Sequence, residues 1–119
     1  MDRKRRPDEA QHRPLTPVLF TLLTILAREP QHGYALLTGI QTDMRLDISQ
    51  ATIYRAIRHA QRLGLVAETP TRPAAPDDDA RRRYWALTRH GRAVLHAEAT
   101  RLYLLGHRAL QNLSFSARA

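Results

Sequence analysis

The sequence predicts a mainly α-helical domain with a small two-stranded β-wing, followed by one long C-terminal helix. Three observations support this fold class. Apolar residues recur at three- and four-residue steps, which is typical of helices with a buried face. Two short β-prone segments, 65–69 and 83–87, flank a loop rich in proline and aspartate. Ser, Thr, Gly and Pro stand where the helices should begin and end.

The chain of 119 residues is long enough for one domain with its own core. It has no cysteine, which excludes disulfides, thiolate metal sites and cysteine nucleophiles. The net charge of +8 favours polyanionic partners, although biased codon usage would also enrich arginine and alanine. No stretch reaches the ~20 apolar residues of a membrane helix. No cleavage site follows the basic N-terminus convincingly, so we expect a soluble, cytoplasmic protein.

Residues 1–13 are polar and carry the run Arg3-Lys4-Arg5-Arg6. Their apolar surface is too small to offset the entropy lost on ordering, so we expect a flexible basic arm. Such an arm can lie along phosphates or enter a minor groove. The alternative is a solubilising tail.

Residues 14–87 are predicted to form the folded unit that follows. Pro14 and Pro17 flank the start of a first, mostly buried helix, and Pro30 ends it. The tripeptide His32-Gly33-Tyr34 opens a second helix.

A third helix begins at Ser49, whose hydroxyl can accept a free amide of the first turn. Gly64 suits the left-handed position that ends it. One face of this helix is apolar and comprises Ile53, Ile57, Ala60 and Leu63. The opposite face is polar and basic and comprises Gln50, Thr52, Arg55, Arg58 and Arg62.

The β-wing is predicted from strands 65–69 and 83–87, with Asp77-Asp78-Asp79 in the loop between them. Tyr84 and Trp85 must point to opposite sides of their strand, so only one can face the core. Thr88 caps a last helix, residues 88–113, which we expect to mediate dimerisation. Residues 114–119 are expected to form a disordered tail.

A basic helix, a tight turn, a strand, a loop and a returning strand, in this order, make a winged helix, which places a helix in a DNA major groove. Three motifs resemble the PadR-like family of winged-helix transcriptional regulators: 32–34, 51–66 and 82–92. The single C-terminal helix is similar to the family's short branch. The chain differs from the family's usual residues at Ala51, Arg55 and Ala60, and none of these three residues breaks a helix. The acidic triplet Asp77-Asp78-Asp79 differs more from the family pattern, because carboxylates at a wing tip would be repelled by DNA phosphates.

The resemblance implies a homodimeric transcriptional regulator, a repressor on a pseudo-palindromic operator in double-stranded DNA. It also allows a small aromatic or hydrophobic effector as a further partner. Two alternatives remain open at this point. One is a sequence-tolerant nucleic-acid-binding protein, and the other is a winged helix that serves as a protein-interaction module.

Arg55 and Arg58 share a helix face, and arginine can bind guanine bidentately or pair with phosphate. Gln50 and Thr52 lie in the first turn, which points most directly at bases. A solvated helix face is the alternative reading of these residues, and structural packing is the alternative for the tyrosines. The predicted DNA-binding residues are Tyr34, Ser49, Gln50, Thr52, Tyr54, Arg55, Arg58, Arg72, Arg81 and Arg82.

The last helix carries an apolar stripe that so small a winged domain cannot cover alone, and an exposed stripe of that size is normally an interface. The predicted dimerisation residues are Leu95, Ala99, Leu102, Tyr103, Leu105 and Ala109. The scattered histidines show no metal-ligand spacing, and no catalytic motif or Gly-rich phosphate loop is present. We therefore expect no metal, no cofactor, no catalytic residue and no enzymatic activity.

Overall fold

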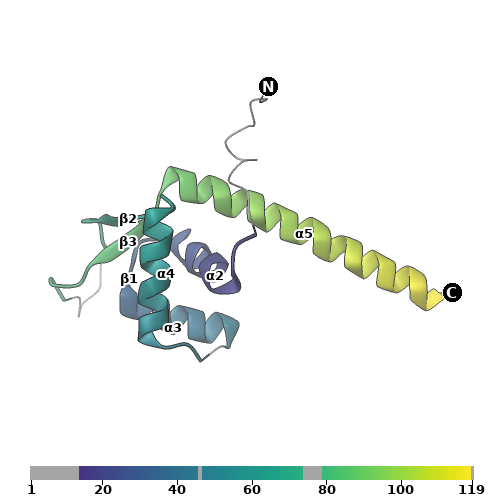
Figure 1. Ribbon diagram of the computed structural model, residues 1–119, viewed down its shortest axis with the longest axis horizontal. Helices are drawn as coiled ribbons and strands as arrows, with labels where there is room; N and C mark the ends of the chain where they lie inside the picture. Colours follow the sequence, from purple (N-terminus) through teal and green to yellow (C-terminus); the bar gives the residue numbers. More distant parts are fainter. Residues whose placement is uncertain (1–13, 46, 74–78, 119) are drawn as a thin grey trace, which may run out of the picture.

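The computed structural model describes residues 14–45, 47–73 and 79–118. The predicted arm, residues 1–13, and two members of the acidic triplet, Asp77 and Asp78, lie outside this range. The elements in chain order are α2 (Pro17–Leu26), β1 (Gln31–His32), α3 (Gly33–Met44), α4 (Gln50–Arg62), β2 (Val66–Thr69), β3 (Tyr84–Leu87) and α5 (Arg89–Arg118) (Figure 1). The predicted mainly helical fold with a small sheet is confirmed.

The core lies where α2, α3 and α4 meet beneath the sheet. Thr16 caps α2 by accepting the Leu19 amide at 3.2 Å, and Pro17 occupies the first turn, where its missing N–H costs nothing. Apolar residues at helical spacing then face inward from all three helices. The buried set comprises Leu19, Leu22, Leu23, Leu26, Leu36, Ile40, Ile53, Ile57 and Ala60.

The connection from α3 to α4 sets the position of α4. Arg45 ends α3 in the left-handed conformation with φ 53°, and the Gln41 amide donates to the Ile48 carbonyl at 3.2 Å. Ser49 caps α4 by accepting the Thr52 amide at 3.1 Å, as the sequence predicts. Gly64, with φ 76°, follows the end of α4, so its predicted left-handed role is confirmed as well.

The sheet has three antiparallel strands in the order β1-β3-β2, so β3 is central. The sequence predicted only the β2–β3 wing, because two residues at β1 give no alternating pattern. Trp85 joins the core, while Tyr84 is buried on the other side of β3 against His32, with their ring centroids 5.4 Å apart. Both aromatic side chains are therefore covered.

The first half of α5 is fixed to the winged part of the molecule. The Thr88 hydroxyl donates to the Gly64 carbonyl at 2.6 Å and accepts the Gly91 amide at 2.9 Å. Further along, the buried Glu98 carboxylate accepts the Leu15 amide at 2.9 Å. These contacts bind the start of α5 to the α4–β2 turn and to the segment before α2.

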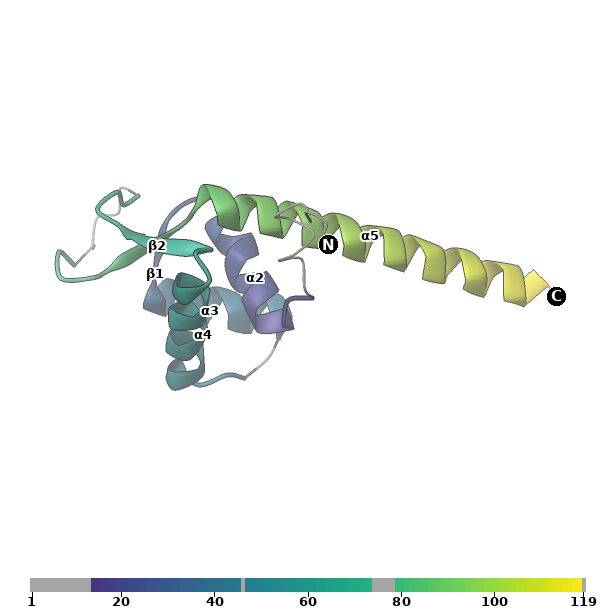
Figure 2. The same cartoon turned by 45° about the horizontal axis from the view of Figure 1, so that its top comes forward.

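The second half of α5 projects away from the rest of the molecule, on the opposite side from the wing (Figures 1 and 2). The helix continues to Arg118, so the prediction of a disordered tail from Ser114 is wrong over 114–118. No glycine or proline interrupts these residues, and nothing in their sequence therefore stops the helix.

Candidate nucleic-acid interface

The exposed face of α4 is polar and basic along its whole length. Gln50, Arg55, Arg58 and Arg62 are exposed, while Ile53 and the apolar residues below it are buried. The Arg55 guanidinium donates to the Thr52 hydroxyl at 3.3 Å, which holds this side chain along the first turn of the helix. The structure thus places most of the predicted recognition residues on one accessible surface.

Two of the predicted residues in this turn also serve the helix itself. The Ser49 and Thr52 hydroxyl oxygens lie 3.0 Å apart, and the Ser49 oxygen accepts the Thr52 amide. Both hydroxyls are thereby oriented by the cap. Gln50, which has no such bond among the described contacts, presents an exposed amide at the start of the helix.

A groove of about 520 Å³ separates α4 from the base of the wing. Arg58 and Gln61 line it from α4, and Arg82 and Arg83 line it from the returning side of the wing. His32 from β1, with Gly33 and Tyr34 at the start of α3, also lines it. Cationic side chains from two separate elements therefore surround one concave surface, which suits a polyanion.

Tyr54 and Tyr34 occupy different positions in this groove. Tyr54 is half-buried, and its ring fills the space over Gly33, where an added Cβ would lie 2.5 Å from the phenolic oxygen. Gly33 is therefore required for this packing. Tyr34 is 64% exposed at the first turn of α3, where amides of the helix N-terminus favour anions.

The wing arginines differ in how firmly they are held. The exposed Arg81 guanidinium pairs with the Asp79 carboxylate at 3.3 Å. The Arg82 guanidinium lies 3.3 Å from Nε2 of His32, the residue that caps α3 through Nδ1. Arg83 lies 3.9 Å from the Glu68 carboxylate on β2. Sequence reasoning missed Arg83, Gln61 and His32, because only the folded chain brings them to the groove.

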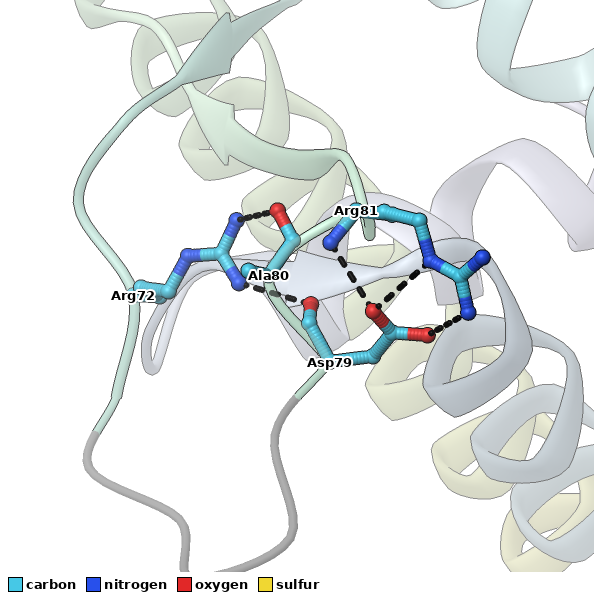
Figure 3. Close-up of polar contacts among 4 residues, drawn as sticks. All are labelled: Arg72, Asp79, Ala80 and Arg81. Atoms are coloured by element: carbon cyan, nitrogen blue, oxygen red, sulfur yellow. Dashed lines mark hydrogen bonds and ion pairs between the residues drawn. The ribbon is translucent and has the colours of Figure 1, made fainter.

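Arg72 was predicted to contact DNA, and the structure shows a different environment for it. Its guanidinium donates to the backbone carbonyl of Asp79 (Figure 3). It also donates to the backbone carbonyl of Arg82 and lies over the ring of Tyr84. Its described contacts are thus made inside the wing. No signal in the sequence identifies them, since carbonyl acceptors are common to every residue.

The predicted dimerisation residues divide into two groups. Leu95 is half-buried and packs against the core of its own chain, so much of its side chain is already covered. The others are exposed, with Leu102 at 41%, Leu105 at 52% and Tyr103 at 73%. Ala99 and Ala109 are exposed as well. Leu104, Leu110, Leu113 and Phe115 extend this apolar surface beyond the predicted set.

The only charged side chain buried among the described residues is Glu98, at the foot of the projecting half of α5. Arg101 donates to its two oxygens at 2.8 Å each. This hydrogen bonding raises the pKa of Arg101, against the opposing effect of burial. Arg101 therefore stays charged at all ordinary pH values.

Over residues 14–45, 47–73 and 79–118, no group of three or more His, Asp or Glu side chains is placed to hold a metal ion. In the same part of the chain, no helix is both long and apolar enough to cross a membrane.

A helix presented beside the β2–β3 wing of a three-stranded sheet, with arginines on both, defines a winged-helix protein. Residues 22–97, more than half of the chain, match the model of the transcriptional regulator PadR-like family. The chain therefore belongs to this family of transcriptional regulators, as its motifs suggested.

Solved structures of similar fold include a PadR family regulator from Clostridium difficile, at 17% identity and TM-score 0.67, covering 82% of this chain and 99% of that one. A PadR-like regulator from Bacillus cereus has 21% identity and TM-score 0.69, covering 81% and 90% respectively. RosR from H. salinarum has 22% identity and TM-score 0.62, covering 92% and 99%. These likenesses establish the fold. No curated protein matches the sequence.

Proposed function

We propose that this protein is a homodimeric, sequence-specific DNA-binding repressor that acts in the cytoplasm on a pseudo-palindromic operator. The observation that carries the proposal is the exposed face of α4 beside the wing arginines. Gln50, Arg55 and Arg58 share that face, and Arg82 borders the same groove from the wing. Membership of a family of transcriptional regulators supports the same conclusion.

The two ends of α4 have different parts in this proposal. Its first turns, with Gln50, Thr52 and Arg55, enter the major groove, where arginine and glutamine distinguish bases by paired hydrogen bonds. Tyr34, Arg81 and Arg82 bind phosphates, and these contacts fix register without reading sequence. The groove between α4 and the wing then holds the sugar-phosphate backbone.

The projecting half of α5 is the dimer interface in this proposal. It exposes seven large apolar side chains from Leu102 to Phe115, and a monomer would leave them in water. A two-fold axis through this helix would present two α4 helices to DNA. Half-sites should then lie about 34–36 Å apart, one turn of the double helix.

Repression would follow from blocking polymerase at the operator. A small aromatic or hydrophobic effector bound at the dimer interface would relieve it only if the effector binds one dimer geometry more tightly than the other. The exposed aromatic pair on α5, Tyr103 and His107, with parallel rings 6.4 Å apart, is compatible with such a ligand.

Footprinting on the DNA upstream of the protein's own gene tests this proposal. We expect two short protected segments, one helical turn apart, at a concentration that leaves random duplex unprotected. Uniform protection would instead indicate a sequence-tolerant nucleic-acid binder. Absence of any protection at low salt would indicate a protein-interaction module, and either result would overturn the proposal.

A further inference from the structure

One arginine spans the base of the wing. Arg72, three residues after the end of β2, donates from Nη1 to the Asp79 carbonyl at 3.0 Å and from Nη2 to the Arg82 carbonyl at 2.8 Å. A longer contact of 3.5 Å joins Nη2 to the Ala80 carbonyl (Figure 3). All three acceptors belong to the segment that returns toward β3.

The same guanidinium is held from below by an aromatic ring. Its central carbon lies 4.5 Å from the centroid of Tyr84, which is 4% exposed and also contacts the His32 ring edge-on. His32 caps α3. Arg72 is therefore connected, through the buried Tyr84 and through His32, to the helix whose first residues line the groove. A cation over an aromatic ring is an attractive contact.

The segment on which Arg72 acts carries two candidate phosphate-binding residues. The Arg82 amide donates to the Asp79 carbonyl at 3.0 Å, and the Arg81 amide donates to the Asp79 carboxylate at 2.9 Å. These bonds close a turn over residues 79–82. Because Arg72 binds carbonyls at both ends of that turn, its position decides where Arg81 and Arg82 stand.

We propose that Arg72 is a positioning residue, which holds this turn so that Arg81 and Arg82 reach DNA phosphates, and that it contacts no phosphate itself. Only arginine has a planar fork of donors that can reach several carbonyls at once; lysine has the charge without the fork. The proposal rests on the proposed function to the extent that the wing must meet DNA.

The dependence of DNA affinity on salt separates the two roles. Each phosphate contact adds about 0.9 to the slope of log affinity against log salt. If Arg72 bound phosphate, Arg72→Lys would preserve the slope and Arg72→Ala would lower it by ~0.9. As a positioning residue, both variants should lower the slope equally, by up to ~1.8 when Arg81 and Arg82 both lose their contacts. Arg28→Ala, an exposed arginine outside the groove, controls for lost charge.

The decisive comparison uses the double variant Arg81→Ala, Arg82→Ala, which lacks both phosphate contacts that Arg72 is proposed to position. Adding Arg72→Ala to it should leave the slope unchanged. A further decrease of ~0.9 would show a direct contact and overturn the proposal. So would an unchanged slope when Arg72 is replaced in the otherwise wild-type chain.

Hydrogen exchange in the free protein supplies a measurement that does not depend on DNA. In Arg72→Lys, the amides of Arg81 and Arg82 should exchange faster, while those of α4 keep their wild-type rates. Unchanged exchange at both amides would overturn the positioning role. If wild-type protein failed to bind any duplex, the proposed function would fail, and this measurement would still report on Arg72.

Discussion

The two halves of α5 reverse the usual relation between polarity and exposure. In the first half, Glu98 is charged and only 1% exposed, whereas in the second half Leu110 and Phe115 are apolar and 69% and 77% exposed. The first half is satisfied within one chain, because every buried side-chain nitrogen or oxygen there has a hydrogen-bond partner among the described residues. The apolar side chains of the second half are removed from water only if a partner covers them.

Physical chemistry accounts for each half separately. A buried carboxylate is tolerated when its oxygens accept several hydrogen bonds, and Glu98 accepts from Arg101 and from the Leu15 amide. A single exposed leucine needs no explanation, but a continuous row of them is the usual mark of an interface. The comparison thus assigns attachment to the first half and supports the proposed dimer interface on the second.

Introducing a charge into the exposed half of α5 should have the largest effect on assembly and on operator affinity. Leu102→Glu would place an unpaired charge in the proposed dimer interface, which is expensive enough to separate the chains. Loss of the second half-site should lower operator affinity on the order of 100-fold or more, although no DNA-facing residue has changed. Sedimentation and a mobility-shift assay measure the two effects. Thr100→Glu, an exposed position nearly opposite on the same helix, should stay dimeric.

Removing one recognition side chain should have a smaller effect and leave assembly alone. Arg55→Ala should weaken operator binding by about 1–3 kcal/mol if Arg55 reads a base, with less change on random duplex. The dimer should persist, since Arg55 lies on α4, away from the exposed half of α5. Equal losses on operator and random DNA would reassign Arg55 to a phosphate.

Breaking the buried contact in the first half should reduce stability instead of DNA recognition. Glu98→Ala removes the acceptor of the Leu15 amide and of Arg101, and unpaired groups of this kind cost about 1–3 kcal/mol. The partial exposure of Arg101 places the expected loss toward the lower end of that range. Thermal unfolding measures it. A variant as stable as wild type would show that this pair does not attach α5.

Two glycines, one in each half of α5, allow the halves to be compared by adding a single methyl group to each. A Cβ on Gly91 would collide with the Leu65 carbonyl oxygen, whereas a Cβ on Gly106 would meet nothing within 4 Å. Gly91→Ala should therefore lower the melting temperature, while Gly106→Ala should raise helix stability by about 0.5–1 kcal/mol in the monomeric Leu102→Glu background. Calorimetry and circular dichroism distinguish the two. Similar shifts for both would contradict the assignment of the halves.

The helices were predictable because their signals are local. Ser49 and Gly64 mark the ends of α4, and the spacing of Ile53 and Ile57 identifies its buried face. The same pattern also gave the exposed face with Arg55 and Arg58. Periodicity and capping act within a few residues, so a single sequence records them.

The parts that escaped prediction depend on residues far apart in the chain. Glu98 is a charged helix residue that local patterns would place in water, and its amide partner lies 83 residues away. β1 is too short to alternate and exists only because β3 pairs with it. In the sequence, Arg72 cannot be distinguished from the other wing arginines, because its carbonyl partners are identified only by the folded structure. Side-chain environments of this kind follow from tertiary contacts, which no local pattern contains.

The central claim is that the winged-helix part of each chain recognises one half-site and that the second half of α5 holds two chains together as a dimer. Affinity for an operator whose half-sites are moved apart by about five base pairs tests it most directly, because half a helical turn puts the second half-site on the other side of the duplex. We predict that affinity falls to that of a single half-site, while the same insertion leaves binding by the Leu102→Glu protein unchanged. Equal wild-type affinity for both spacings would contradict the account.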